Sequence, residues 1–329
     1  MPDPTTEPRP APALVSVIIP CYNVRDFVED AVSSALDQTY ANLDVVVVDD
    51  GSTDDSADLL RRLASRRDDQ RLRIISQKNR GLAGARNTGL RHAWGELIAF
   101  LDADDLWSAD KVARHVSLMA ADETIGLSFS DSAYLNENGS PTGALLASRK
   151  FEPTLHDMLR RNHFGNGSSV VARRQCFALA GCFNEDLRSC EDYEMWCRIL
   201  WATSYKAVRI PGPLTYYRLR HASLSFNALG FVEQADRAIH VLEELMPFVP
   251  RRVFRMGHAE HYRIAAWKAL LAGNDEQAWR LLWRALQLYP WLAVLDFRPA
   301  VVAGALALPS RYRAPTAAFG KRMLSRATS

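Results

Sequence analysis

Three carboxylates in close succession, Asp102, Asp104 and Asp105, follow directly on an apolar run from Glu96 to Leu101. Such a run is typical of a buried parallel strand, and open α/β sheets bind ligands beyond the carboxyl ends of their strands. Carboxylates packed this closely repel one another, and Mg²⁺ or Mn²⁺ with oxygen ligands would relieve the repulsion. The segment therefore predicts a metal site that could also hold a diphosphate. The alternative is structural, because Asp105 or Ser108 could cap the helix that follows.

A second polar segment follows the strand predicted from Val15, which we expect to break at Pro20. Tyr22 could stack on a nucleotide base, and Asn23 could hydrogen-bond to the same base. The alternative is an ordinary strand-to-helix turn, in which Tyr22 packs against the edge of the sheet.

A third polar segment follows the run from Val45 to Val48, which lacks polar alternation and predicts an interior parallel strand. Asp49 and Asp50 stand at its carboxyl end, where one of them could accept hydrogen bonds from a base N–H or a ribose hydroxyl. The following helix is expected to take its N-terminal cap from Ser52, Thr53 or Asp54.

Glycines and arginines are interspersed from Asn79 to Gly89, after a strand predicted from Leu72 to Ser76. The segment contains G-x-x-G but lacks the full dinucleotide fingerprint G-x-G-x-x-G, so it gives little support to a nicotinamide cofactor. Backbone N–H groups at a helix start, together with Arg80 and Arg86, instead suit an anionic ligand such as a phosphate.

The elements that must position these residues alternate between strand and helix from Val15 to Leu101. This order predicts an α/β fold, a Rossmann-like and mostly parallel sheet with helices on both faces. The elements expected after it are a helix at Lys111–Ala121, a strand at Gly126–Ser130, a hairpin over Ser132–Gly143, a strand after Asn166, and strands at Lys206–Ile210 and Leu214–Arg218.

The chain becomes helical in character after Ser225. Gly273, Ala278, Ala285 and Pro290 have the spacing of the second helix of a tetratricopeptide unit, with His258 to Leu271 as the first helix. Because a free-standing array normally needs at least about three repeats, this single unit is expected to pack on the preceding domain as a helical hairpin.

Six segments, taken in order, resemble the motifs of the family 2 glycosyltransferases, and the resemblance extends from about Val15 to Ser225. The first four segments are Val15–Asn23, Val48–Asp54, Gly81–Gly89 and Gly95–Asp105. The last two are Cys190–Arg198, which carries Glu-Asp-x-x-x-Trp-x-Arg, and Tyr217–Ser225, which ends in Ser-x-Ser. Each motif alone is modest, but six in this order and spacing are highly specific.

The resemblance implies a GT-A fold and an inverting transfer from a nucleotide-diphosphate sugar, with a UDP-sugar as the first choice of donor. The implied nucleotide-binding residues are Pro20, Tyr22, Asn23, Asp50, Arg80, Arg86 and Asp102, although the family does not fix one arginine for the phosphates. The implied metal ligands are Asp102, Asp104 and His221. Single displacement needs one carboxylate near the acceptor hydroxyl, and the match assigns that general base to Asp192.

Glu191 is the competing candidate for the base, because neighbouring residues at a helix start point in different directions. Both carboxylates could instead only stabilise a helix N-terminus. Two other functions remain open. A nucleotidyltransferase would also use carboxylates and a metal, but no Gly-rich signature with a nearby lysine opens the first strand. A degenerate domain that binds nucleotide-sugar or glycan without turnover should have lost Asp104 or Asp192, and both are present.

The motifs divide the chain into a disordered leader at residues 1–13, a catalytic domain at 14–225 and a helical region at 226–329. Within the catalytic domain, residues 14–105 form the expected nucleotide-sugar part and residues 106–225 the acceptor part. The leader lacks the basic and apolar regions of a signal peptide.

Composition fits an enzyme that works in the cytoplasm. The five cysteines are odd in number and lack C-x-x-C pairs, which argues against a disulfide framework and a zinc site. No run of 18 apolar residues occurs, so a spanning helix is not expected.

The chain from residue 251 onward carries 13 Lys and Arg against 4 Asp and Glu. With Trp279, Trp283 and Trp291 nearby, this balance fits the inner face of an anionic membrane and hence a lipid-linked or other glycan acceptor in cell-surface glycan synthesis. The alternative is a solvated helix face with core tryptophans. No motif for nucleic-acid recognition accompanies the charge, so nucleic acid is not an expected partner.

Overall fold

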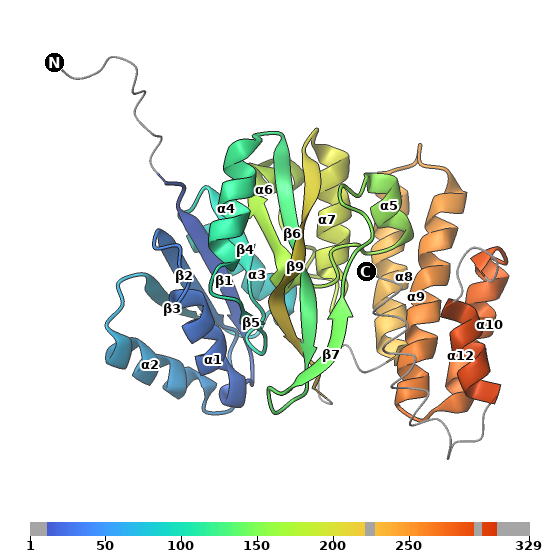
Figure 1. Ribbon diagram of the computed structural model, residues 1–329, viewed down its shortest axis with the longest axis horizontal. Helices are drawn as coiled ribbons and strands as arrows, with labels where there is room; N and C mark the ends of the chain where they lie inside the picture. The colour runs from blue at the N-terminus through green and yellow to red at the C-terminus, as the bar shows by residue number, and fades with distance from the viewer. Residues whose placement is uncertain (1–11, 221–227, 293–297, 308–329) are drawn as a thin grey trace.

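The computed structural model describes residues 12–220, 228–292 and 298–307, and the arrangement of its elements is shown in Figure 1. The strands are β1 (Val15–Cys21), β2 (Leu43–Asp49), β3 (Leu72–Ser76), β4 (Leu97–Phe100), β5 (Leu106–Trp107), β6 (Ile125–Leu135), β7 (Pro141–Leu146), β8 (Val170–Arg173) and β9 (Lys206–Arg218). The helices of the first two thirds are α1 (Arg25–Leu36), α2 (Ser56–Arg67), α3 (Gly81–His92), α4 (Lys111–Ala121), α5 (Leu155–Arg160), the 3₁₀ turn η1 (Gly167–Ser169), α6 (Arg174–Ala180) and α7 (Glu191–Ala202). Those of the last third are α8 (Ala228–Leu245), α9 (Arg251–Leu271), α10 (Asp275–Leu288) and α12 (Arg298–Ala307).

These strands form one mixed sheet in the order β3-β2-β1-β4-β8-β6-β9-β5, with β7 paired to β6. The first four strands are parallel, β8 runs antiparallel to β4, and β6 and β9 are again parallel. The predicted α/β sheet is therefore confirmed. Its parallel first half brings the carboxyl ends of β1, β2 and β4 to one edge.

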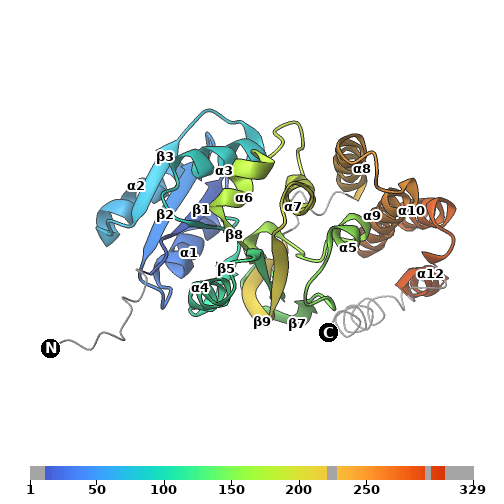
Figure 2. The ribbon, with the colours of Figure 1, turned by 90° about the horizontal axis from the view of Figure 1, so that it is seen from above.

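Helices cover both faces of the sheet, which explains why its strands lack polar alternation. On β1, Val17 and Ile19 belong to a core shared with α1, α2 and α4, whereas Ile18 belongs to the core beneath α3, α6 and α7. Figure 2 shows α1 and α4 on one side of the sheet and α3, α6 and α7 on the other. Successive side chains of a strand point to opposite faces, so both sets of side chains must be apolar.

Four local predictions need correction. β1 continues through Pro20, because its pairing with β4 ends at Ile18 and the missing N–H of proline falls beyond that ladder. β6 is longer than predicted, and residues 206–218 form one strand, β9, with register shifts rather than two strands. The N-cap of α2 is Asp55, with no capping bond from its side chain, while the Asp54 carboxylate accepts from Ser56 N.

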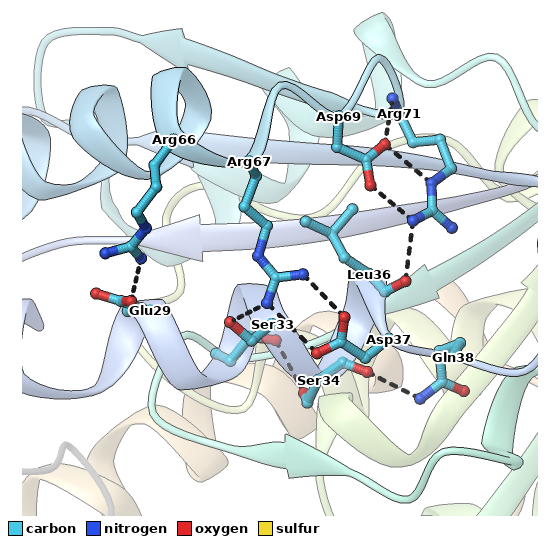
Figure 3. Close-up of polar contacts among 11 residues, drawn as sticks. Glu29, Ser33, Ser34, Leu36, Asp37, Gln38, Arg66, Arg67, Asp69 and Arg71 are labelled. Atoms are coloured by element: carbon cyan, nitrogen blue, oxygen red, sulfur yellow. Dashed lines mark hydrogen bonds and ion pairs between the residues drawn. The ribbon is translucent and has the colours of Figure 1, made fainter.

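Arginine pairs fasten α1 to α2 and to the loop before β3 (Figure 3). Arg67 donates to Asp37, at 2.8 Å, and to Ser33, while Arg66 pairs with Glu29. Arg71 donates to the Leu36 carbonyl at 3.0 Å. These contacts hold α1 and α2 against each other, mainly at the ends opposite the loops after β1 and β2.

The C-terminal helices pack on the sheet domain through α8 and α9, which lie beside α7 and α5. Ile239 and Leu242 of α8 belong to the same buried core as Trp196 of α7. The predicted helical hairpin corresponds to α9 and α10, although α9 begins at Arg251 rather than at His258. Within the described ranges, no helix combines the length and apolar character needed to cross a membrane.

Replacing Lys268 with methionine should stabilise the protein at neutral pH, by about 1–3 kcal/mol. Lys268 lies over the ring of Phe231, at 3.6 Å, and burial lowers the pKa of its ammonium to about 8. Above pH 8 the folded protein no longer carries this disfavoured charge, whereas the unfolded chain stays protonated until its ordinary pKa. The stability gap between variant and wild type should therefore narrow as pH rises from about 8 towards 10. Denaturant unfolding at several pH values measures this gap, and a constant gap would contradict the assignment.

Candidate active site

The loops after β1 and β2 are tied together by Asn23. Its side-chain oxygen accepts from Thr53 N at 2.8 Å, and its backbone N–H donates to Ser52 Oγ at 3.2 Å. Asn23 takes a positive φ of 52°, a conformation that asparagine tolerates better than most residues. The amide that we expected to bond to a base thus has a structural role, and its contact with a base stays a prediction.

Asp50 is buried and organises the turn before α3. One carboxylate oxygen accepts from Gln77 Nε2 at 2.6 Å and from Arg80 N at 2.8 Å, and the other accepts from Gly81 N at 2.8 Å. Each oxygen therefore already has a protein donor. Tyr22 beside it is 47% exposed, so its ring is open for stacking rather than packed on the sheet edge.

The loop after β4 holds the three predicted carboxylates in two different environments. Asp102 and Asp104 are partly exposed, whereas Asp105 is buried. Asp105 accepts from Ser168 Oγ at 2.6 Å and from Arg218 N at 3.0 Å, so it anchors the loop. The capping alternative is wrong, because α4 begins after Asp110 and no side chain caps it.

Arg86 connects the β4 loop to the start of α7. Its guanidinium donates to Asp102 Oδ1 at 2.8 Å and to Glu191 Oε1, and only 2% of its surface is exposed. The rings of Phe100 and Phe183 lie against it. A Cβ at Gly167 would come within 2.7 Å of Arg86 Nη2, so glycine makes room for the guanidinium. In this structure the guanidinium is buried between two carboxylates. The contact with a phosphate that we expected of Arg86 stays a prediction.

Arg80 also faces a carboxylate in this structure. Both of its contacts to Glu185 measure 2.8 Å, and its side chain remains 44% exposed. Because Arg80 lies at the N-terminus of α3 and close to solvent, a phosphate could still reach it. That contact stays a prediction.

Asp192 and Glu191 begin α7 after Cys190, which has a positive φ of 62°. Glu191 is enclosed, and burial raises its pKa to about 7 against the opposing charge of Arg86. Asp192 is partly exposed and accepts from Tyr193 N at 2.7 Å. Burial also raises the pKa of Asp192, while Arg86 lowers it. Of the two carboxylates, Asp192 is the one that a substrate can approach.

Four residues that the sequence did not assign to the site surround the carboxylates of the β4 loop. Arg220 pairs with Asp104 at 2.8 Å, and the guanidinium groups of Arg218 and Arg220 both lie over the ring of Phe27. Ser168 accepts from Asp102 N at 3.0 Å, in addition to its bond to Asp105. The signal in the sequence that could have identified Arg218 and Arg220 was the pair itself, two arginines separated by one residue at the end of a strand. His221, the predicted third metal ligand, lies outside the described residues.

A buried lysine fixes the turn that carries Ser168. Lys111 Nζ donates to Ser169 O at 3.0 Å, and Trp107 Nε1 donates to Ser168 O at 2.9 Å. Lys111 is fully buried, and burial lowers its pKa well below the usual range. Nothing in the local sequence pattern marks this lysine, since its burial depends on contacts with distant segments.

Asp102 and Asp104 have the chemistry that a hard divalent cation requires. Burial raises the pKa of Asp104 and the neighbouring charge of Asp102 raises it further, while the pairing with Arg220 lowers it. A divalent cation bound by both carboxylates would relieve their repulsion. Across the described ranges, no group of three or more His, Cys, Asp and Glu side chains forms a ready metal site. Two carboxylates still fit, because Mg²⁺ is usually held by one or two carboxylates together with substrate phosphates.

Comparison with known proteins decides the family. Residues 16–177 match the sequence profile described as "Glycosyl transferase family 2". The chain is 32% identical over 243 residues to a putative teichuronic acid biosynthesis glycosyltransferase, TuaG, of Bacillus subtilis, covering 72% of this chain and 93% of that one. The chain belongs to glycosyltransferase family 2. It is also 34% identical, over 65% of its length and 80% of the relative, to the Escherichia coli enzyme WfgD, a UDP-Glc:α-D-GlcNAc-diphosphoundecaprenol β-1,3-glucosyltransferase.

Solved structures show that this glycosyltransferase has the GT-A fold. The mannosyltransferase PcManGT from Pyrobaculum calidifontis, whose structure contains GDP-Man and Mn²⁺, has a TM-score of 0.61 at 24% identity and covers 100% of this chain and 89% of that one. Residues 1–349 of S. aureus TarS give a TM-score of 0.60 at 18% identity, covering 95% and 90% of the two chains. At these sequence identities, the structural similarity establishes the fold and nothing further.

Proposed function

We propose that this glycosyltransferase moves a sugar, with inversion, from a UDP-sugar to a hydroxyl of a lipid-linked glycan during synthesis of a bacterial cell-surface polysaccharide. The observation that carries this proposal is the Arg86 bridge, which holds the carboxylates of the β4 loop beside the acidic start of α7. The donor and acceptor classes come from the similarity to WfgD and TuaG. We place the reaction in the cytoplasm, at the inner face of the plasma membrane.

The donor would lie across the edge formed by the loops after β1, β2 and β4. Tyr22 stacks on the base, and Asp50 shapes the turn on which Arg80 meets the diphosphate. Asp102 and Asp104, with His221, would hold Mg²⁺ or Mn²⁺, which supplies Lewis-acid stabilisation of the leaving diphosphate when bound.

The acceptor would approach Asp192 at the start of α7. Its carboxylate takes the proton from the acceptor hydroxyl while the acceptor oxygen bonds to the anomeric carbon and the bond from that carbon to the diphosphate breaks. This is general-base catalysis, and it needs no protein nucleophile. Glu191 stays paired with Arg86 and holds the helix start in place.

Replacing Asp104 with asparagine should abolish the metal-dependent part of donor binding. A ligand that binds only the folded state raises its melting temperature, so a thermal-shift panel of nucleotides and UDP-sugars with and without Mn²⁺ measures this binding. The wild type should be stabilised by UDP more strongly when Mn²⁺ is present, and the variant should lose that difference.

Asp30→Asn serves as the matched control, because Asp30 is an exposed carboxylate on α1. It should bind UDP and Mn²⁺ as the wild type does. Undiminished Mn²⁺-dependent binding in the Asp104 variant would overturn its assignment. No stabilisation of the wild type by any nucleotide would count against the proposed donor class.

A further inference from the structure

The outer face of α10 carries large aromatic side chains that nothing in the described structure covers. The helix buries Ala278, Leu281 and Leu282 against α9 and α12, as the amphipathic pattern requires. Its opposite face presents Trp279, which is 46% exposed, and Trp283, which is 64% exposed. These two residues are four positions apart and therefore lie next to each other on the helix surface.

Cations accompany these tryptophans. Arg280 and Arg284 follow them directly on the same exposed face, and Arg280 pairs with Glu276 at 3.0 Å. Trp291, just beyond the end of α10, is 63% exposed. Single exposed aromatic residues are ordinary, but a continuous apolar patch with a polar rim marks an interaction site.

The charge of the surrounding chain is also uneven. Residues 308–329 contain five Arg and Lys and no Asp or Glu. On the far side of α9, helix α8 carries the acidic residues Glu233, Glu243 and Glu244. Figure 2 shows α9 between α8 and α10. Among the described residues, Arg280 and Arg284 accompany the tryptophan face, and these glutamates stand on the opposite side of α9.

We propose that this face, made of Trp279, Arg280, Trp283 and Arg284, docks on the surface of a bilayer that contains anionic phospholipid. Indole rings combine an apolar body with a polar N–H and settle at the level of lipid headgroups. Arginine side chains lay their apolar stems along the surface and direct their charge to lipid phosphates. The value of such docking rests on the proposed function, since it would bring the site to a lipid-linked acceptor, but the docking itself needs no substrate.

Point variants test this surface better than removal of the C-terminal region. Val253 and Phe254 of α9 belong to the main core with Trp196, so a deletion from residue 251 would damage the fold of the catalytic domain. The double variant Trp279→Ser/Trp283→Ser changes only side chains on the exposed face. Trp94→Ser is the matched control, because Trp94 is 65% exposed and lies between α3 and β4, over Arg73.

The experiment is flotation of the full-length protein with vesicles of phosphatidylcholine alone or mixed with phosphatidylglycerol. The wild type and Trp94→Ser should float with the mixed vesicles, less with phosphatidylcholine alone, and less again at high salt. The double variant should bind the mixed vesicles roughly tenfold more weakly.

Equal flotation of the double variant and the wild type would overturn the proposal. A second result would also overturn it: light scattering shows that the wild type is a dimer and the double variant is not, and neither protein binds vesicles. The tryptophan face would then contact a second copy of the chain instead of a membrane. The thermal shift with UDP and Mn²⁺ should be the same in all three proteins. Failure of that shift would count against the donor site without bearing on the membrane surface.

Discussion

Replacing Asp192 with asparagine should lower turnover by roughly 10²–10⁴-fold while the affinity for UDP and Mn²⁺ stays nearly unchanged. The amide fills the same space but cannot accept the proton of the acceptor hydroxyl. Asp192 must be ionised to act, and burial raises its pKa. The wild-type rate should therefore fall as the pH drops through a value above the usual range of aspartate, which a pH profile of kcat measures.

Glu191→Gln is the matched variant, because it changes the adjacent carboxylate in the same way. Glu191 is 2% exposed and paired with Arg86, so this change should affect stability more than turnover. If Asp192→Asn keeps its turnover while Glu191→Gln loses it with the fold intact, the base is Glu191 and not Asp192.

Replacing Arg86 with methionine should destabilise the protein by about 3–5 kcal/mol, because it leaves the buried carboxylate of Glu191, and the partly exposed one of Asp102, without their cation. Arg86 is the cation that joins Asp102 to Glu191, and its own pKa is raised by these carboxylates against the effect of burial. Denaturant unfolding measures the loss. Turnover should fall as well, since the β4 loop and the start of α7 are no longer held together.

A double-mutant cycle separates this bridge from a simple packing defect. Glu191→Gln removes one of the two carboxylates, so adding it to Arg86→Met should restore part of the lost stability. Strictly additive losses in the double variant would show that Arg86 and Glu191 are not coupled. Arg86→Lys keeps the charge but lacks the planar fork that reaches two carboxylates, and its stability should lie between those of wild type and Arg86→Met.

The sequence alone determined the architecture of the parallel half of the sheet and the location of the carboxylates at the ends of its strands. The apolar runs that precede Asp50 and Asp102 lack polar alternation because both faces of their strands are covered. This pattern can be recognised from neighbouring residues alone. The register then places their ends together, since Cys21 pairs with Asp49 and Ile18 with Phe100 across β1. The general form of the site followed from strand order and the rule for the carboxyl ends of parallel strands.

Only the tertiary structure determined which charged and polar side chains pair with each other. Arg86 lies 105 residues from Glu191, and Asp105 lies 63 residues from Ser168. No periodicity records such partners, so the sequence did not show that Arg86 pairs with Glu191, offered Asp105 as a helix cap, and passed over Ser168 and Arg220. The hydrophobic periodicity of a segment shows which of its own residues are buried. The partner of a buried charged residue depends instead on which ends of strands and helices the fold brings together.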